Sequence, residues 1–384
     1  MKNNKTVVGI ITGSAGDWGG ASRVLYTNLR LLDRSRIHPV LLLPHDGPII
    51  PELEEKQIDY TIWGALTEPG NPLAYLKAMW RMIGFLRRHK VDILHINHSN
   101  SWRPAELLAA RLMRVPILMH YHTVNTRPGP FVSLSTAAIA VSDYVMRHSL
   151  PARLPKYVVY NPVDLKRFDA ARDIRHKLGF EQHHILVSFL GQIRTIKGVG
   201  DFIDMAKRIP HPDARFLIAG ECRDPDKFDG SYSEADLQAA FAGDPRLRYL
   251  GYVSRVEDLY RSSDIVVVPS RWQEPLGLIN LEAGACRKPV VATRSGGIPE
   301  IIDDGENGFL VDIGDVDALV EKVALLIGDA NLRLRMGEAA RARVEDDFTT
   351  RPVRELEALY ERMAQPIQGN RTGFAKPVPT DAQP

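Results

Sequence analysis

The sequence predicts an α/β protein made of two Rossmann-like domains, each built on a parallel sheet. The chain has 384 residues, which is too long for one compact core and suits two domains of ordinary size. Short apolar runs rich in β-branched residues alternate with longer stretches of helical periodicity, a rhythm typical of β-α-β units. This rhythm pauses in the proline-bearing stretch 151–162 and then restarts, which favours two halves joined near residues 162–180.

In the first half, five apolar runs predict buried strands. Amphipathic stretches between them predict helices over Ala21–Leu32, Leu73–His89 and Pro104–Arg114. The predicted strands are Val7–Thr12, Val40–Leu43, Ile93–Ile96, Ile117–His120 and Ala138–Val141.

The second half repeats the pattern with six further apolar runs. Helices are predicted over Gly200–Arg208, Val256–Arg261 and Val316–Ile327, and a long helical stretch over Asn331–Met363 is interrupted around Phe348–Pro352. The predicted strands are Ile185–Leu190, Arg215–Ala219, Leu247–Leu250, Ile265–Val268, Val290–Thr293 and Phe309–Val311.

The composition narrows the class of protein. No apolar run reaches the roughly 18–20 residues that a membrane span needs. The short run Val7–Ile11 breaks at Gly13 and reads as a first strand, not a signal peptide. The two cysteines, Cys222 and Cys286, offer neither a disulfide framework nor zinc spacing, so we expect a cytoplasmic protein.

Positive charge is concentrated in one part of the chain. The net charge is +2, yet residues 75–156 hold twelve Lys or Arg against three Asp or Glu. Such an excess predicts an anionic partner, for instance a membrane surface, a lipid diphosphate or a nucleic acid. The alternative is that these charges are only solvated helix faces.

A glycine-rich turn follows the first predicted strand and includes Gly13, Gly16, Gly19 and Gly20. Glycines allow backbone amides to approach a ligand at the start of a helix. The dinucleotide fingerprint fails, because Ala15 stands where its second glycine is required, and no acidic residue occupies the ribose position. A dehydrogenase is therefore disfavoured, and a purely structural tight turn remains an alternative.

A second loop with cations follows the first strand of the second half. Gly191-Gln-Ile-Arg194-Thr-Ile-Lys197-Gly198 lies at the carboxyl end of that strand, where open α/β sheets bind ligands. The spacing does not fit the phosphate loop of ATPases. Arg194 and Lys197 can still neutralise a diphosphate, although they could also be ordinary surface cations.

The segment from Val268 to Glu282 is the most informative part of the sequence. A strand ends at Val268, a loop carries Glu274, and Pro275 stands where the first residue of a helix is expected. The amides of Leu276 and Gly277 would then lie at a helix start, where a phosphate binds well. Glu274 and Glu282 supply carboxylates that accept hydrogen bonds from sugar hydroxyls.

These motifs together resemble the retaining GT-B glycosyltransferases of the large GT4 group, over residues 6 to about 364. The resemblance implies two Rossmann-like domains whose parallel sheets face a deep inter-domain cleft. The motifs that carry it, in chain order, are Gly19-Gly20-Ala-Ser-Arg-Val, Asp92-Ile-Leu-His95, Tyr121-His122-Thr123, Ala140-Val-Ser142, Tyr160-Asn161-Pro-Val-Asp164, Gly191 to Gly198, Gly251-Tyr-Val253, Glu274 to Glu282, Gly296-Gly297-Ile-Pro-Glu300 and Asp304-Gly-Glu-Asn-Gly308.

The resemblance also implies a role for each candidate residue. His122 would stand near the anomeric carbon at the floor of the cleft, and Gly19 and Gly20 would let the backbone approach the donor. In the second domain, Glu274 would contact the donor sugar, Lys197 the diphosphate and Glu282 the ribose. The remaining contacts would come from the backbone of Tyr252 and Val253 to the base, the amides of Leu276 and Gly277 to the diphosphate or sugar, and Arg194 to the diphosphate.

One position departs from the family. Members commonly carry Gly-Arg where this chain has Gly191-Gln192, and Arg194 is the candidate replacement for the missing cation. No Asp-x-Asp cluster stands on a predicted strand-end loop, so we expect a site without metal or other cofactor in which cations and a helix start stabilise the leaving group. Retention follows from the resemblance and requires no protein nucleophile.

The acceptor is less visible in the sequence. On the predicted helix Leu73–His89, Leu76, Trp80 and Ile83 recur at helical spacing beside a basic stripe of Lys77, Arg81 and Arg88. A basic amphipathic helix can lie on an anionic membrane, which would make the protein peripheral on the inner face of the cell membrane. The alternative is a core helix with one solvated side.

The sequence thus predicts a hexosyl-type transferase that moves a sugar from a UDP- or GDP-sugar to a glycan or lipid-linked acceptor, in cell-surface polysaccharide or glycolipid synthesis. The expected domains are 1–165 for the acceptor, 166–348 for the donor, a helix over 349–365 that returns to the first domain, and a disordered tail, 366–384. The alternatives are a sugar-nucleotide epimerase, an inactive binding subunit, and a nucleic-acid binder, which the lack of any such module disfavours.

Overall fold

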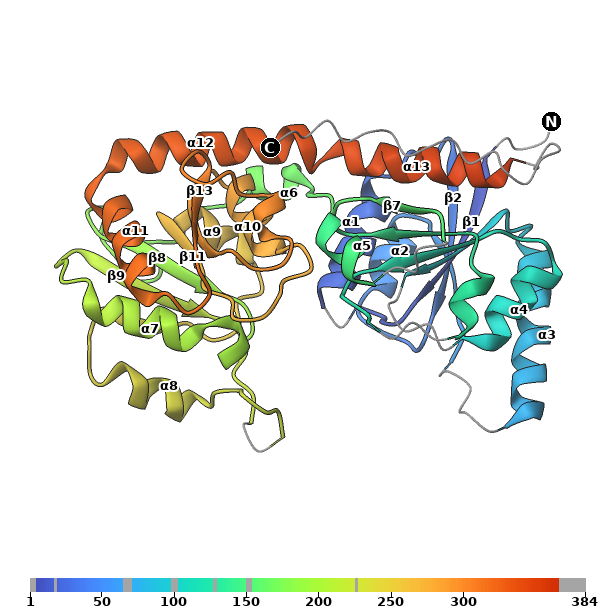
Figure 1. Ribbon diagram of the computed structural model, residues 1–384, viewed down its shortest axis with the longest axis horizontal. Coiled ribbons are helices and arrows are strands. Elements are labelled where there is room, and N and C mark those ends of the chain that lie inside the picture. Colours follow the sequence, from blue (N-terminus) through green and yellow to red (C-terminus); the bar gives the residue numbers. More distant parts are fainter. Residues whose placement is uncertain are drawn as a thin grey trace. The chain divides into compact units, whose positions relative to one another are not determined.

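The computed structural model describes residues 5–16, 19–64, 71–97, 103–126, 130–149, 154–224 and 227–365 (Figure 1). The chain divides into two compact units. The first contains the described residues up to Pro162 together with those from Pro352 onward, and the second is Val163–Arg351. The predicted tail, 366–384, lies outside the described residues.

The first unit is built on a seven-stranded parallel sheet of order β3-β2-β1-β4-β5-β6-β7. Strands β4, β5 and β6 are buried along their whole length, as expected for a parallel sheet covered on both faces. The strands are β1 (Thr6–Thr12), β2 (Ile37–Leu43), β3 (Asp59–Ile62), β4 (Ile93–Asn97), β5 (Ile117–Tyr121), β6 (Ala137–Ala140) and β7 (Lys156–Val158).

Helices connect these strands and supply much of the apolar core. Five of them precede the second unit, and a sixth, α13 (Thr350–Ala364), comes from the end of the described chain. Val353, Leu356 and Tyr360 of α13 pack into the same core as β1 and β2. The earlier helices are α1 (Gly20–Leu31), α2 (Ile50–Glu55), α3 (Pro72–Arg88), α4 (Pro104–Leu112) and α5 (Asp143–Ser149), with a short 3-10 helix at Pro130–Leu134.

The second unit has a six-stranded parallel sheet of order β10-β9-β8-β11-β12-β13. The strand order reverses direction between β8 and β11, which creates the switch point where such sheets bind ligands. The strands are β8 (Ile185–Leu190), β9 (Ala214–Ala219), β10 (Leu247–Tyr249), β11 (Ile265–Val268), β12 (Val290–Thr293) and β13 (Gly308–Val311).

The helices of the second unit cover both faces of its sheet. α10 packs closely on α12, because Gly284 and Gly337 have no side chain at the contact: a Cβ on Gly337 would lie 2.2 Å from the Arg287 carbonyl oxygen. The helices are α6 (Leu165–Asp169), α7 (Val199–Arg208), α8 (Glu234–Phe241), α9 (Val256–Ser262), α10 (Leu278–Ala285), α11 (Val316–Gly328) and α12 (Ala330–Asp347), with short 3-10 helices at Thr195–Lys197 and Ile298–Glu300.

The structure confirms the predicted α/β class and corrects some elements. The proline-bearing stretch 151–162 holds strand β7. Strand β3 was missed because none of its residues is fully buried, so it lacks a continuous apolar run. The missed helix α8 begins with a capping box, in which the Ser233 side chain accepts from the Asp236 amide and the Asp236 carboxylate accepts from the Ser233 amide. The predicted interruption near Phe348 is confirmed, since α12 ends at Asp347 and α13 begins at Thr350.

The three apolar residues predicted on α3 differ in their burial. Leu76 and Trp80 are 50% and 63% exposed, whereas Ile83 is buried. The buried residues of the helix all lie between Met82 and Leu86, so only its C-terminal half packs on the core. Within the described residues, no helix combines the length and the hydropathy that a bilayer crossing requires.

Candidate active site

The second unit brings Lys197 and Glu274 together at the carboxyl edge of its sheet. Lys197 ends the short 3-10 helix after β8, and Glu274 lies in the loop after β11, the strand paired with β8. Both loops therefore leave the sheet at its switch point, where ligands of open α/β sheets bind.

Glu274 accepts two short hydrogen bonds through a single oxygen. Lys197 Nζ lies 2.6 Å from Glu274 Oε1, and Ser270 Oγ donates to the same atom at 2.8 Å. The two charged side chains are 24% and 12% exposed, and Ser270 is buried. The carboxylate is thus held in one orientation and remains partly open to solvent, which suits a group that binds a polyhydroxyl ligand.

Backbone contacts hold the Glu274 loop from the other side. The Gly297 amide donates to the Glu274 carbonyl at 2.8 Å, and the Gly296 amide donates to Gln273 Oε1 at 2.7 Å. Gly296 has φ +56°, and a Cβ there would lie 2.0 Å from the Glu274 carbonyl oxygen. Only glycine fits this close approach, which explains part of the Gly296-Gly297-Ile-Pro-Glu300 motif.

The helix after Glu274 begins later than the sequence predicts. Pro275 is not its first residue: α10 starts at Leu278, and Gly277 caps it with φ +95°, a left-handed conformation that favours glycine. Leu276 is buried and anchors the loop. The amides of Leu276 and Gly277 donate to no acceptor within the described part of the chain, and they lie just before the helix N-terminus, a position that favours an anion.

Glu282 lies within α10 and is nearly buried. Tyr260 of α9, itself buried, donates from its hydroxyl to Glu282 Oε2 at 2.8 Å. This bond fixes one carboxylate oxygen of Glu282 in the low-dielectric interior, where a hydrogen bond to a charged group is strong.

The structure does not join the other second-unit candidates to this cluster. Arg194 Nη2 donates to the Asp229 carbonyl at 2.9 Å, so its guanidinium is directed to a neighbouring loop. Tyr252 and Val253 follow β10, and the Tyr252 side chain is 69% exposed. Gln192 is also exposed.

The first unit places its candidates at the carboxyl edge of its own sheet. Gly19 caps α1 and Gly20 is the first residue of that helix, and both are exposed. His122 directly follows β5 and is 8% exposed. Its Nε2 lies 2.9 Å from Oδ1 of Asn97, the last residue of β4.

A column of buried imidazoles continues behind His122. The His120 ring lies 3.9 Å from the His122 ring and 5.3 Å from the His95 ring, between centroids. The Tyr360 hydroxyl lies 2.6 Å from His95 Nδ1. Burial lowers the pKa of His95 to about 3, and burial with the neighbouring imidazoles lowers the pKa of His120 well below its usual value. Both rings are therefore neutral at physiological pH.

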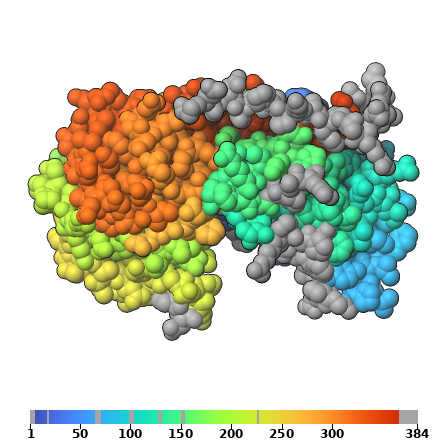
Figure 2. Space-filling view, viewed as in Figure 1, coloured from blue at the N-terminus to red at the C-terminus, as the bar shows by residue number. Residues whose placement is uncertain are grey.

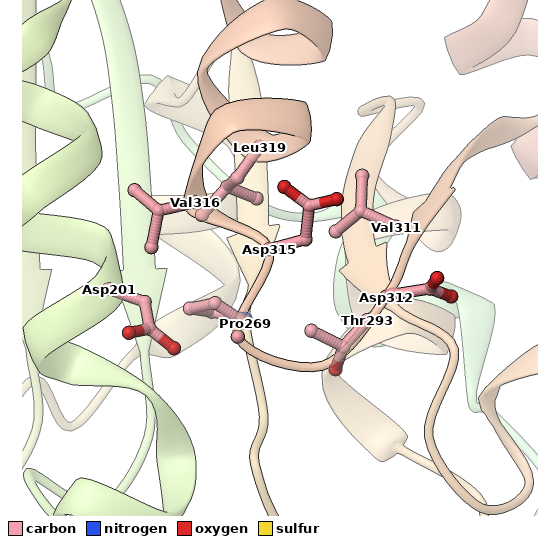
Figure 3. Close-up of a pocket in the computed structure, with 9 residues that line it drawn as sticks. Asp201, Pro269, Thr293, Val311, Asp312, Asp315, Val316 and Leu319 are labelled. Atoms are coloured by element: carbon pink, nitrogen blue, oxygen red, sulfur yellow. The ribbon is translucent and has the colours of Figure 1, made fainter.

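A separate depression in the second unit does not fit the binding of a diphosphate (Figure 3). It lies between α7 and α11 and encloses about 0 Å³ of space for even a water molecule, whereas typical small-molecule sites hold roughly 300 Å³. Three carboxylates, those of Asp201, Asp312 and Asp315, line it. Their charge disfavours a diphosphate, so we assign no ligand to it.

Sequence reasoning missed Ser270, Tyr260, Ser295 and Asn97. Ser295 Oγ accepts from the Glu274 amide at 3.3 Å, and the other contacts are those given above. Tyr260, Ser295 and Asn97 act through a neighbour that is distant in the chain, whereas Ser270 donates to Glu274 four residues away. The only available signal was their position: Ser270, Ser295 and Asn97 stand at or just after the carboxyl ends of strands.

Comparisons with known families cover both units. Residues 18–167 match the family described as Glycosyltransferase Family 4, and residues 171–343 match the family described as Glycosyl transferases group 1. The chain is 29% identical to the N-acetyl-alpha-D-glucosaminyl L-malate synthase of Bacillus anthracis, over 89% of this chain and 93% of the relative. It is 30% identical to the lipopolysaccharide core biosynthesis mannosyltransferase LpcC of Rhizobium leguminosarum bv. viciae, over 82% of this chain and 92% of that protein.

A solved structure shares the fold along nearly the whole chain. The crystal structure of Anabaena Alr3699/HepE in complex with UDP superposes with a TM-score of 0.76 at 22% identity, covering 93% of this chain and 99% of that one. At this identity the similarity shows the fold.

Proposed function

Because the chain belongs to the GT4 family of glycosyltransferases with the GT-B fold, we propose that it transfers a sugar from a UDP- or GDP-sugar to a glycan or lipid-linked acceptor, with retention of anomeric configuration. The observation that carries the donor site is the cluster of Lys197, Glu274 and Ser270 at the switch point of the second sheet.

Each candidate group of the second unit matches a part of a nucleotide sugar. Lys197 supplies positive charge for the diphosphate, and the amides of Leu276 and Gly277 add donors at the start of α10. Glu274 accepts from hydroxyls of the transferred sugar. Glu282 accepts from the ribose hydroxyls while Tyr260 holds its other oxygen. The backbone at Tyr252 and Val253 contacts the base.

In the proposed reaction, the bond between the anomeric carbon and the diphosphate oxygen breaks and the acceptor hydroxyl forms the new bond on the same face. The acceptor proton passes to an oxygen of the departing diphosphate, so no protein nucleophile is required. The main catalytic task is to stabilise charge on the leaving group, which electrostatic groups fixed in place perform well. His122 contributes a hydrogen bond to the transferred sugar.

We further propose that the reaction needs no metal ion. The cations available to the leaving group are Lys197 and, after adjustment of its present bond to Asp229, Arg194. Activity that persists in excess chelator is expected. Activity abolished by chelator and restored by a divalent cation would contradict the proposal.

The exposed face of α3 and α4 supports the proposal that the sugar acceptor is held at an anionic membrane. Leu73, Leu76 and Trp80 of α3 and Leu108 and Leu112 of α4 are exposed on two helices that pack together. Exposed basic residues accompany them, and Figure 2 shows the segment that contains α3, in light blue, at the surface. A face that is both apolar and basic is typical of helices that lie on anionic lipid. The basic residues are Lys77, Arg81, Arg88 and Arg111.

Vesicle binding tests the membrane proposal. Co-sedimentation with vesicles rich in phosphatidylglycerol should exceed that with phosphatidylcholine alone, and the double change Leu76→Gln with Trp80→Gln should abolish the difference. Leu334→Gln is the matched control, since Leu334 of α12 is 67% exposed but lies outside this face. Equal co-sedimentation of the wild-type protein with the two kinds of vesicle would contradict the proposal.

Donor and reaction are tested together on the purified protein. A thermal shift with UDP, GDP and ADP identifies the base, and the UDP complex of the Anabaena relative makes UDP the first nucleotide to try. Slow hydrolysis of the matching sugar nucleotide should follow. An isomerised sugar nucleotide formed without acceptor would instead support the alternative, a sugar-nucleotide epimerase of the same architecture.

A further inference from the structure

Asn97 and His122 form a buried pair at the ends of two neighbouring strands. β4 and β5 run parallel with Ile96 opposite Met119, which places Asn97 and His122 on the same face of the sheet. Asn97 is 3% exposed, and its Oδ1 lies 2.9 Å from His122 Nε2. An amide oxygen can only accept a hydrogen bond, so this contact requires a proton on Nε2.

The titratable side chains that lie behind Asn97 and His122 carry no positive charge near neutral pH. His120 of β5 stacks against His122, His95 of β4 stacks against His120, and Tyr360 of α13 contacts His95. All three are buried, and burial disfavours the charged form of each imidazole. These neighbours therefore place no positive charge beside His122, and Asn97 Oδ1 is an acceptor that favours a proton on its Nε2.

We propose that Asn97 is a positioning residue that holds His122 in the neutral tautomer protonated at Nε2. In that tautomer Nδ1 carries the lone pair and can accept a hydrogen bond from a sugar hydroxyl. This inference rests on the proposed glycosyl transfer for its catalytic part, whereas the tautomer itself is a property of the free protein. A histidine tautomer is commonly fixed by the partner of its second nitrogen.

Two substitutions of Asn97 separate the effect of its hydrogen-bond acceptor from the effect of a charge at the same position. Asn97→Leu has a similar volume and removes the acceptor, so Nε2–H loses its buried partner and the Nδ1–H tautomer becomes populated. Asn97→Asp keeps an acceptor at Nε2 but adds a negative charge, which favours the imidazolium and raises the pKa of His122. Tyr360→Phe is the control, because it alters the far end of the column and leaves the Asn97 contact intact.

The ring nitrogens of His122 report the tautomer directly. Multiple-bond 1H–15N spectra of histidine-labelled protein, assigned with His122→Gln, should show the Nε2–H form in the wild type and in Tyr360→Phe. The spectrum of Asn97→Leu should contain the Nδ1–H form. For turnover with a sugar nucleotide and acceptor, we expect Asn97→Leu to lower kcat about 10-fold or more at nearly unchanged KM, the effect of an unsatisfied buried donor. Asn97→Asp should retain activity at alkaline pH and lose it on acidification.

The outcomes separate this inference from the proposed function. A wild-type His122 protonated at Nδ1, or an unchanged spectrum in Asn97→Leu, would overturn the positioning role. The expected tautomer in a protein that neither transfers nor hydrolyses any sugar nucleotide would support the role of Asn97 and overturn the proposed function. A fall in kcat for Tyr360→Phe as large as that for Asn97→Leu would mean that the column has only a structural role.

Discussion

Lys197 Nζ lies 2.6 Å from Glu274 Oε1, although the two residues are 77 positions apart in the chain. The cation proposed for the diphosphate is thus paired with the carboxylate proposed for the sugar. A partly buried charge is costly when it is left alone, so the pair keeps both groups ordered before the donor binds. Under the proposed function, donor binding would exchange these contacts, with the diphosphate pairing with Lys197 and the sugar hydroxyls binding Glu274.

The first prediction concerns Lys197. Lys197→Ala removes the cation that we propose stabilises the leaving group, and we expect kcat to fall on the order of 10²–10³-fold, as for the loss of other transition-state donors. Lys322→Ala is the control, since Lys322 pairs with the exposed Glu321 on α11. Steady-state kinetics with the identified donor provide the measurement. Equal kcat values in the two variants would remove Lys197 from the site.

The second prediction concerns Tyr260. Tyr260→Phe keeps the buried ring but removes the hydrogen bond to Glu282, so the nucleotide should bind about 10-fold more weakly, the range for a lost bond to a charged group. Calorimetry should show that this loss disappears when the ligand lacks the ribose hydroxyls. Tyr157→Phe, in the first unit, should bind as the wild type does. A loss that is identical for ribose and deoxyribose ligands would argue against the proposed contact.

The third prediction concerns His122. His122→Ala should lower turnover on the order of 10²-fold or more, in the range for lost acid–base or hydrogen-bonding groups. His148→Ala is the matched control, because His148 is an exposed histidine of α5 in the same unit. Donor affinity measured by calorimetry should change much less than turnover. Turnover close to the wild-type value would exclude His122 from catalysis.

The fourth prediction compares two glycines of the second unit. Gly296 and Gly305 both have positive φ, but a Cβ would strike the Glu274 backbone at Gly296 and would meet open space at Gly305. Gly305→Ala should cost about 1 kcal/mol of stability from backbone strain alone. Gly296→Ala should cost more and should also displace the Glu274 loop, with turnover lower on the order of 10²-fold. Similar melting temperatures and activities for the two variants would contradict the close contact.

The fifth prediction concerns pH. The pKa of His95 is about 3 in the folded protein, below the ordinary value of 6.5. Between these values the unfolded chain binds a proton that the folded chain does not, so acidification from pH 7 to pH 5 destabilises the protein. The slope approaches about 1.4 kcal/mol per pH unit for this residue. His95→Phe combined with Tyr360→Phe should give a shallower slope in calorimetric melts, and an unchanged slope would contradict the prediction.

The sequence determined the class of fold and most of its elements. β-branched apolar runs such as Ile185–Leu190 and Ile265–Val268 coincide with strands β8 and β11, because interior parallel strands must be apolar along their whole length. Elements that lack such a run were missed, among them the edge strands β3 and β7. The start of α10 was misplaced because the left-handed conformation of Gly277 delays the helix, and a proline alone does not reveal this.

The sequence also identified the residues that carry the proposed chemistry, since ordered motifs at strand ends name Lys197, Glu274, Glu282 and His122 by type and position. Only the tertiary structure decided how they are held. Lys197 meets Glu274 because β8 and β11 are neighbours in the sheet, and Asn97 meets His122 because β4 and β5 are neighbours. Residues without a chemical motif of their own, such as Ser295 and Tyr260, gain their role from contacts between distant segments. Local periodicity carries no information about such contacts, because strand order and burial arise only when the whole sheet has formed.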